Sequence, residues 1–226
     1  MLNRTEEIRN YRKLVLSANK ESIKKEAFKD LLNRLFAHNS ETKNVVDVIT
    51  SGAEKPILNI PRKDRLHRGS ADTLYNKIII EFENDLKKSL KHAKEQLAGY
   101  LLGQYKSGEG YNYTLIASDL IVWKVFSIDI SSLEQLGELR EDEVILNEIE
   151  TSSFTLTDHN AEDFYFWIDR FLFKEEKLKA TLKRIEEAFG NQSLVFRESY
   201  LEMQNYFDTV KDSGEVQVSY EQWKKL

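Results

Sequence analysis

The stretch from residue 69 to residue 100 constrains the fold more than any other part of the chain. It reads GSADTLYNKIIIEFENDLKKSLKHAKEQLAGY. Residues 77–83 form a short β-branched and aromatic run, which predicts a buried strand. Asn84 then offers a helix cap, and apolar residues follow at helical spacing from Leu86 to Leu101. The stretch therefore predicts a strand, a cap and a helix in close succession.

Acidic side chains gather at one end of this predicted strand. Because side chains alternate along a strand, Glu81 and Glu83 share one face. Asp72 lies just upstream in a Gly-Ser segment that can fold back beside them. Like charges this close raise each other's pKa or require a cation, and all-oxygen ligand sets suit Mg²⁺. The three carboxylates therefore predict a magnesium site.

The same residues carry a resemblance to a known family. Asp72 is followed nine positions later by Glu81-Phe-Glu83 and then by a helix with Gln96 and Tyr100. This order resembles the PD-(D/E)XK nuclease superfamily. The greatest likeness is to the N-terminal endonuclease domains of type IIG restriction-modification enzymes, whose sequences resemble aD…IIEFE…L…A.EQL..Y. The likeness covers roughly residues 26–129.

The resemblance implies a Mg²⁺-dependent DNA endonuclease with double-stranded DNA as its substrate. In that function Asp72 and Glu81 hold the metal, and Glu83 binds metal or orients and deprotonates the attacking water. Gln96 and Tyr100 would line the site from the helix, with Gln96 among the catalytic residues and Tyr100 contacting DNA.

Glu83 stands where most of the superfamily has Lys, and this difference keeps other interpretations open. The chain could be a catalytically inactive relative that binds nucleic acid or another protein, or an acidic scaffold without a ligand. If it is active, the missing positive charge has to come from a metal or a neighbouring cation. Of the lysines nearby in sequence, we favour Lys94 over Lys77 for this role.

Two helices are expected before this stretch, over residues 5–17 and 22–37, because their apolar residues recur on one face. In the resembling nucleases the first core helix often sends a Glu toward the metal, which identifies Glu26 as a further ligand. A solvated Glu26 is the alternative. Residues 44–50 and 56–60 are short apolar runs that predict strands or a hairpin.

Basic residues flank the acidic cluster on both sides. PRKDRLHRGS, residues 61–70, reads as a loop whose Arg65 and Arg68 either contact DNA phosphates or are simply solvated. On the predicted helix, Lys87, Lys91 and Lys94 form a stripe opposite the apolar face. That stripe is either an ordinary solvated surface or a second DNA contact.

Further β-rich runs at residues 111–118 and 120–128, and helical patterns at 161–173, 178–189 and 194–210, complete the expected fold. We predict an α/β domain over residues 1–175, with a central mixed sheet of about five strands flanked by helices, like that of restriction endonucleases. Residues 176–226 are expected to form a C-terminal helical extension, a linker toward a further domain.

Composition limits the remaining possibilities. The 226-residue chain is 41% hydrophobic and has no cysteine, which allows a sizeable core and excludes thiolate zinc sites and thiol catalysis. No apolar run is long enough to cross a bilayer or to form a signal peptide, so we expect a cytoplasmic protein with no membrane contact. Because the net charge is −5, we expect DNA binding to come from a local basic patch or from a further segment outside this sequence.

The end of the chain, SYEQWKKL, reads as a helix without a cap or breaker. This pattern suggests a fragment of a longer protein. If the resemblance holds, an adenine-N6 methyltransferase and a target-recognition domain follow Leu226.

Overall fold

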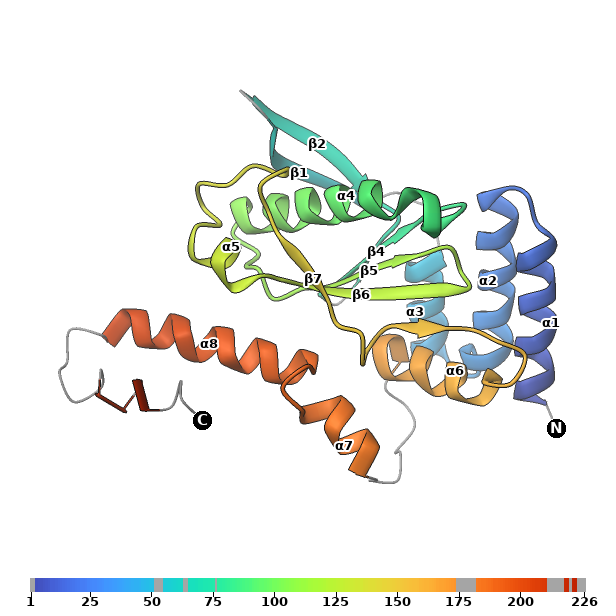
Figure 1. Cartoon of the computed structure of the whole chain (residues 1–226). Helices are drawn as coiled ribbons and strands as arrows, with labels where there is room; N and C mark the ends of the chain where they lie inside the picture. The colour runs from blue at the N-terminus through green and yellow to red at the C-terminus, as the bar shows by residue number, and fades with distance from the viewer. Residues whose placement is uncertain are drawn as a thin grey trace. The chain divides into compact units, whose positions relative to one another are not determined.

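The computed structural model describes residues 3–50, 55–62, 65–75, 77–173, 182–210, 218–219 and 221–222 (Figure 1). The chain divides into two compact units, Met1–Lys179 and Ala180–Leu226. The first unit contains every described strand and the carboxylates predicted to bind metal. The second contains the helices α7 (Leu182–Phe189) and α8 (Leu194–Val210).

Three helices open the first unit. α1 (Arg4–Ser17) and α2 (Glu21–Phe36) lie where the sequence predicts them, and α1 begins at an Asn3 side chain that accepts from the Glu6 N–H at 3.3 Å. The strand predicted at residues 44–50 is wrong, because this segment belongs to α3 (Ser40–Thr50). Its β-branched composition suggests a strand, but Val46 and Ile49 are buried one helical turn apart.

The centre of the unit is a six-stranded mixed sheet in the order β3-β4-β5-β6-β7, with β8 paired to β6. The prediction of an α/β fold with a mixed sheet flanked by helices is confirmed, with one strand more than the approximate number expected. The strands are β3 (Thr73–Tyr75), β4 (Ile78–Phe82), β5 (Thr114–Ser118), β6 (Val122–Ile128), β7 (Leu146–Glu148) and β8 (Phe154–Thr155). Among the described strands of this sheet, β4 and β5 are the one parallel pair, and the other pairs are antiparallel.

A long helix, α4 (Leu86–Lys106), connects the parallel strands β4 and β5. It begins at Asp85, whose side chain accepts from the Lys88 N–H at 3.4 Å, so the cap lies one residue after the predicted Asn84. Parallel neighbours need such a crossover, and the helix of a crossover covers one face of the sheet. Glu83 lies against this helix, because its carboxylate accepts a hydrogen bond from the Ser89 side chain of α4.

The other face is covered by α2 and by α6 (Ala161–Ile168) through aromatic packing. The Trp123 ring of β6 lies 5.2 Å from the Phe28 ring of α2 and 5.3 Å from the Trp167 ring of α6, centroid to centroid. Phe82 of β4 joins the same cluster, 6.1 Å from Phe28. This core holds α2 against the end of β4, next to the carboxylates.

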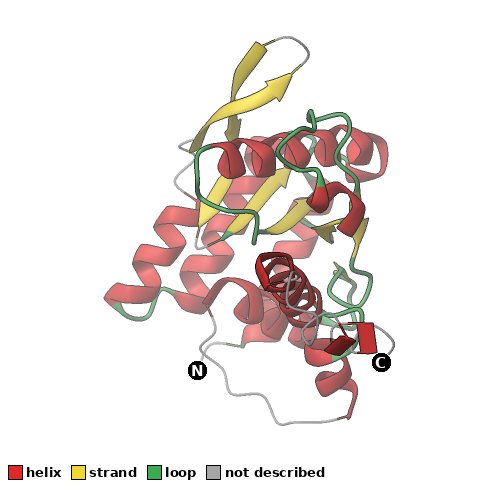
Figure 2. Cartoon of the chain, turned by 90° about the vertical axis from the view of Figure 1, so that its left-hand side faces the viewer, coloured by secondary structure: helices red, strands yellow, loops and turns green. Residues whose placement is uncertain are grey.

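A separate hairpin packs against α4 and extends beyond it (Figure 2). It consists of β1 (Lys55–Arg62) and β2 (Arg65–Ala71), so residues predicted as a loop are largely strand. The close approach depends on Gly103 of α4, where a Cβ atom would lie 2.5 Å from Ile57 Cγ2 and 2.7 Å from the Leu58 carbonyl oxygen. The hairpin ends directly before Asp72 and so connects the basic segment to the site.

The remaining elements complete the fold. α5 (Ile130–Glu134) follows β6, and α6 continues as a π-helical segment, η1 (Asp169–Phe173), within the helix predicted at 161–173. Leu178 lies outside the described residues, as does most of SYEQWKKL. In the described ranges no helix is both long and apolar enough to pass through a bilayer.

Candidate functional site

Asp72 and Glu81 lie side by side at the end of β4. β3 and β4 pair in antiparallel register, with Thr73 opposite Ile80. Asp72 and Glu81 are the next residues beyond this pair, and the Asp72 backbone donates a hydrogen bond to the Glu81 carboxylate. The Phe82 backbone N–H donates to Asp72 Oδ2 at 2.9 Å, and this bond fixes the aspartate carboxylate at the strand end.

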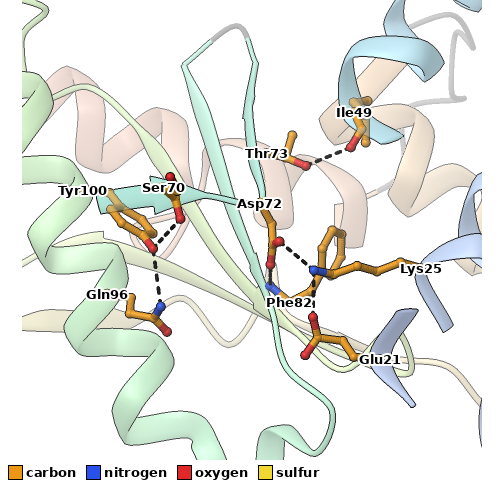
Figure 3. A network of polar contacts seen from close by, with 9 residues as sticks. All are labelled: Glu21, Lys25, Ile49, Ser70, Asp72, Thr73, Phe82, Gln96 and Tyr100. Carbon is orange, nitrogen blue, oxygen red and sulfur yellow. Dashed lines mark hydrogen bonds and ion pairs between the residues drawn. The ribbon is translucent and has the colours of Figure 1, made fainter. Parts of the chain in front are cut away.

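A lysine from α2 completes the environment of Asp72. The Lys25 ammonium donates to Asp72 Oδ1 at 2.6 Å and forms an ion pair with Glu21 Oε1 at 2.7 Å (Figure 3). It also lies 5.5 Å from the centroid of the Phe82 ring. Burial lowers the pKa of Lys25, but its bonds to Asp72 and Glu21 outweigh this effect and raise the pKa overall. Lys25 is therefore a firmly charged cation in contact with the carboxylate cluster.

Glu81 is in the opposite situation, because it is buried and forms no ion pair with any cation in the described part of the chain. Its exposed fraction is 7%. Burial raises the pKa of Glu81 to about 8, and the negative charge of Asp72 adds to the rise, while a hydrogen bond from the Asp72 backbone and the charge of Lys25 partly offset it. Glu81 Oε2 is fully buried and has no hydrogen-bond partner among the described residues. A buried carboxylate oxygen left this way is costly unless it meets a proton or a cation.

Glu83 follows β4 and remains tied to the sheet, because its backbone N–H donates to the Ser118 carbonyl at 2.8 Å. Its side chain is half-buried, and burial raises its pKa. His92 and a hydrogen bond from the Ser89 side chain, both on α4, partly oppose that rise. Glu83 therefore lies between the sheet and the first turns of α4, in the electrostatic neighbourhood of Asp72.

Gln96 and Tyr100 connect α4 to the segment that carries Asp72. The Gln96 side-chain amide donates to the Tyr100 hydroxyl at 3.4 Å, and that hydroxyl donates to the Ser70 carbonyl at 2.7 Å (Figure 3). Tyr100 is only 5% exposed, so its contacts here are with protein. Gln96 Oε1 is buried without a hydrogen-bond partner among the described residues. The pair thus positions the end of β2, immediately before the site.

The structure does not bring Glu26, Lys87 or Lys91 into this cluster. Glu26 is exposed on α2, one position past Lys25, and Glu21 is the α2 carboxylate that joins the network instead. Lys87 is exposed, and Lys91 pairs with Glu95 at 3.8 Å. The backbone of the segment with Arg65 and Arg68 forms β2, but their side chains lie outside the described part.

The two lysines considered as replacements for the family's Lys are engaged elsewhere. The Lys94 ammonium lies 5.5 Å from the centroid of the Phe126 ring. Lys77 donates to the Glu109 carbonyl at 2.5 Å and to the Tyr113 hydroxyl at 3.2 Å. Lys25 is the cation that contacts Asp72, and sequence reasoning missed it. The only local signal is its i,i+4 spacing from Glu21, which is common on solvated helices.

Among the described residues, no three His, Asp or Glu side chains converge closely enough to hold a metal ion. A magnesium site nevertheless needs few protein ligands, because Mg²⁺ keeps several waters and is often bound by one or two carboxylates together with substrate phosphates. Asp72 and Glu81 supply two such carboxylates. The partnerless Oε2 of Glu81 is an oxygen ligand of the kind that Mg²⁺ prefers, so the residues present fit the ion.

No protein-family model, no curated protein and no solved structure matches the chain.

Proposed function

We propose that the first unit is a Mg²⁺-dependent endonuclease domain of the PD-(D/E)XK type, which hydrolyses phosphodiester bonds of double-stranded DNA. The observation that carries the proposal is the proximity of Asp72 to Glu81 at the end of β4, where one buried oxygen of Glu81 has no hydrogen-bond partner among the described residues. The order of strand, carboxylates and α4 supports the resemblance to the endonuclease domains of type IIG restriction-modification enzymes.

In this function Asp72 and Glu81 would hold the ion, which when bound stabilises charge on the scissile phosphate and activates water. Glu83 would take the proton of the attacking water, because its raised pKa makes it a better base near neutral pH. Gln96 and Tyr100 hold the segment before Asp72 against α4 and would in this way position the Asp72 carboxylate.

The substrate and partners follow from the same proposal. The β1–β2 hairpin, with Arg65 and Arg68 in its sequence, and the exposed Lys87 and Lys91 of α4 would contact DNA phosphates. A type IIG enzyme would act on DNA in the cytoplasm. It would also carry an adenine-N6 methyltransferase and a target-recognition domain beyond Leu226.

One observation favours a second function, that of a catalytically inactive nucleic-acid-binding or interaction module. The ion pair of Lys25 with Asp72 compensates the charge of that carboxylate without a metal. If this pair is permanent, the cluster is structural and the chain needs no divalent ion.

Cleavage of supercoiled plasmid DNA in Mg²⁺ separates the two functions. We expect the protein to relax or linearise the plasmid, and EDTA, Asp72→Asn or Glu81→Gln to abolish cleavage. Asp30→Asn is the matched control, because it removes one exposed carboxylate of α2 and should leave cleavage unchanged. Equal cleavage by Glu81→Gln and the unmodified protein would refute the assignment.

A further inference from the structure

Lys25 occupies the position where a bound cation would be expected. Its ammonium lies 2.6 Å from Asp72 Oδ1, while Asp72 Oδ2 is taken by the Phe82 N–H. Both oxygens of Asp72 are therefore engaged without a metal. A magnesium ion bound to Asp72 would lie about 2.1 Å from one of these oxygens. An ammonium at hydrogen-bond distance from the same carboxylate would then repel it at close range.

Lys25 can move away from Asp72 and keep an acidic partner. Its side chain is one-third exposed, and its four-carbon stem is flexible. Glu21, one helical turn earlier on α2, already holds the same ammonium at 2.7 Å. Lys25 can therefore give up Asp72 and stay paired with Glu21, so that its release leaves no isolated charge in the site.

We propose that Lys25 is an internal counter-ion which competes with the divalent metal for Asp72, and which after displacement stays on Glu21 as the site's positive charge. The inference rests on the proposed function, because it needs a metal at Asp72 and Glu81. It deepens that function by naming the residue that replaces the Lys absent at position 83. It also explains why two carboxylates lie together while only one of them has a cation.

If Lys25 competes with the metal, removing its ammonium should change metal affinity in the opposite direction from that expected for a merely structural ion pair. If Lys25 only shapes the site, its removal leaves metal affinity unchanged or lowers it, because Asp72 loses its anchor. If Lys25 competes, its removal frees Asp72 Oδ1 and raises metal affinity. The sign of the change in Kd therefore decides between the two roles.

The test is a calorimetric titration of Mn²⁺ into the whole chain and two variants. Lys25→Met removes the competing ammonium and keeps most of the apolar stem. Lys24→Met is the matched control, because Lys24 is the preceding residue of α2 and donates to the Asn84 carbonyl at 2.6 Å rather than to a carboxylate. Both variants remove one positive charge from the same part of the helix.

We expect Lys25→Met to bind Mn²⁺ about tenfold more tightly, within the usual range of coupling between two binding events. Lys24→Met should bind it like the unmodified protein. Equal or weaker binding by Lys25→Met overturns the inference, and so does equal tightening in both variants. If none of the three proteins binds Mn²⁺, the proposed function itself has failed. The two failures are therefore distinguishable.

A second measurement does not depend on the folding of Lys25→Met. In the unmodified protein with labelled lysines, Mg²⁺ should shift the side-chain ammonium signal of Lys25 and leave that of Lys24 in place. Lys25→Arg assigns the signal. A Lys25 signal that does not move at saturating Mg²⁺ overturns the proposed displacement.

The role of Lys25 as the positive charge of the site is tested separately by the rate of DNA cleavage. A protein with Lys25→Met should cut DNA at least about tenfold more slowly although it binds metal more tightly, and Lys25→Arg should regain part of the rate. Cleavage by Lys25→Met at the unmodified rate overturns the role of Lys25 as the site's cation.

Discussion

Glu81→Gln removes the buried ionisable group of the site while keeping its size, and it should change how stability depends on pH. The folded-state pKa of Glu81 is about 8, against an ordinary value of 4.5. Folding therefore favours protonated Glu81, and this contribution is fully present below pH 4.5. It is lost progressively as the pH rises to about 8, where the buried carboxyl ionises. The pKa difference corresponds to at most ~5 kcal/mol.

The assay is urea denaturation in metal-free buffer at several pH values from 5 to 9, followed by tryptophan fluorescence. Trp123 and Trp167 are buried in the first unit and report its unfolding. Titrations of groups that do not interact with Glu81 cancel in the difference between the two proteins. Glu81→Gln should have nearly the unmodified stability at pH 5 and be several kcal/mol more stable at pH 9. A difference that does not change with pH would refute the burial argument for Glu81.

Other variants test the remaining parts of the account. Glu83→Ala should be strongly impaired in DNA cleavage, and unimpaired cleavage would show that Glu83 has no catalytic role. Glu83→Lys should keep the circular-dichroism spectrum of the unmodified protein and bind Mn²⁺ with lower affinity or stoichiometry in a calorimetric titration. Gly103→Ala should destabilise the protein by ~1–3 kcal/mol in thermal unfolding, because the added methyl would overlap the hairpin backbone. Gly137→Ala should not, because its added methyl would lie at an ordinary contact distance of 4.0 Å from the Tyr105 side chain; equal effects would contradict this packing. Asp85→Ala should cost ~1 kcal/mol through loss of the α4 cap, and an unchanged midpoint in urea would argue against that cap.

The sequence predicts those parts of the fold in which a local pattern is also the final structure. The β-branched run before Glu81 is buried on both faces, and the apolar spacing after Asp85 is long enough to specify a helix. Both predictions therefore hold. Asn84 and Asp85 are both favourable N-cap residues, and the sequence prediction of Asn84 is wrong because α4 is capped by Asp85. Residues 44–50 mislead because their β-branched residues favour a strand, while burial of Val46 and Ile49 one turn apart requires a helix.

The site is only partly predictable for a physical reason. Glu81 can be located from strand alternation, but its raised pKa depends on its burial in the folded unit and on the charge of Asp72, which no local pattern encodes. Lys25 lies 47 residues before Asp72, and the two meet because α2 packs its Phe28 against Phe82 of β4. A search for the missing cation along the sequence favours Lys94, which the fold places against an aromatic ring instead.

Anomalous diffraction from a crystal soaked in Mn²⁺ tests the central claim most directly, because it locates the ion rather than its effects. The account predicts one strong peak about 2.1 Å from an oxygen of Asp72 and from the buried oxygen of Glu81, with the Lys25 ammonium moved from Asp72 toward Glu21. A fully occupied Lys25–Asp72 ion pair with no Mn²⁺ peak between Asp72 and Glu81 would contradict it.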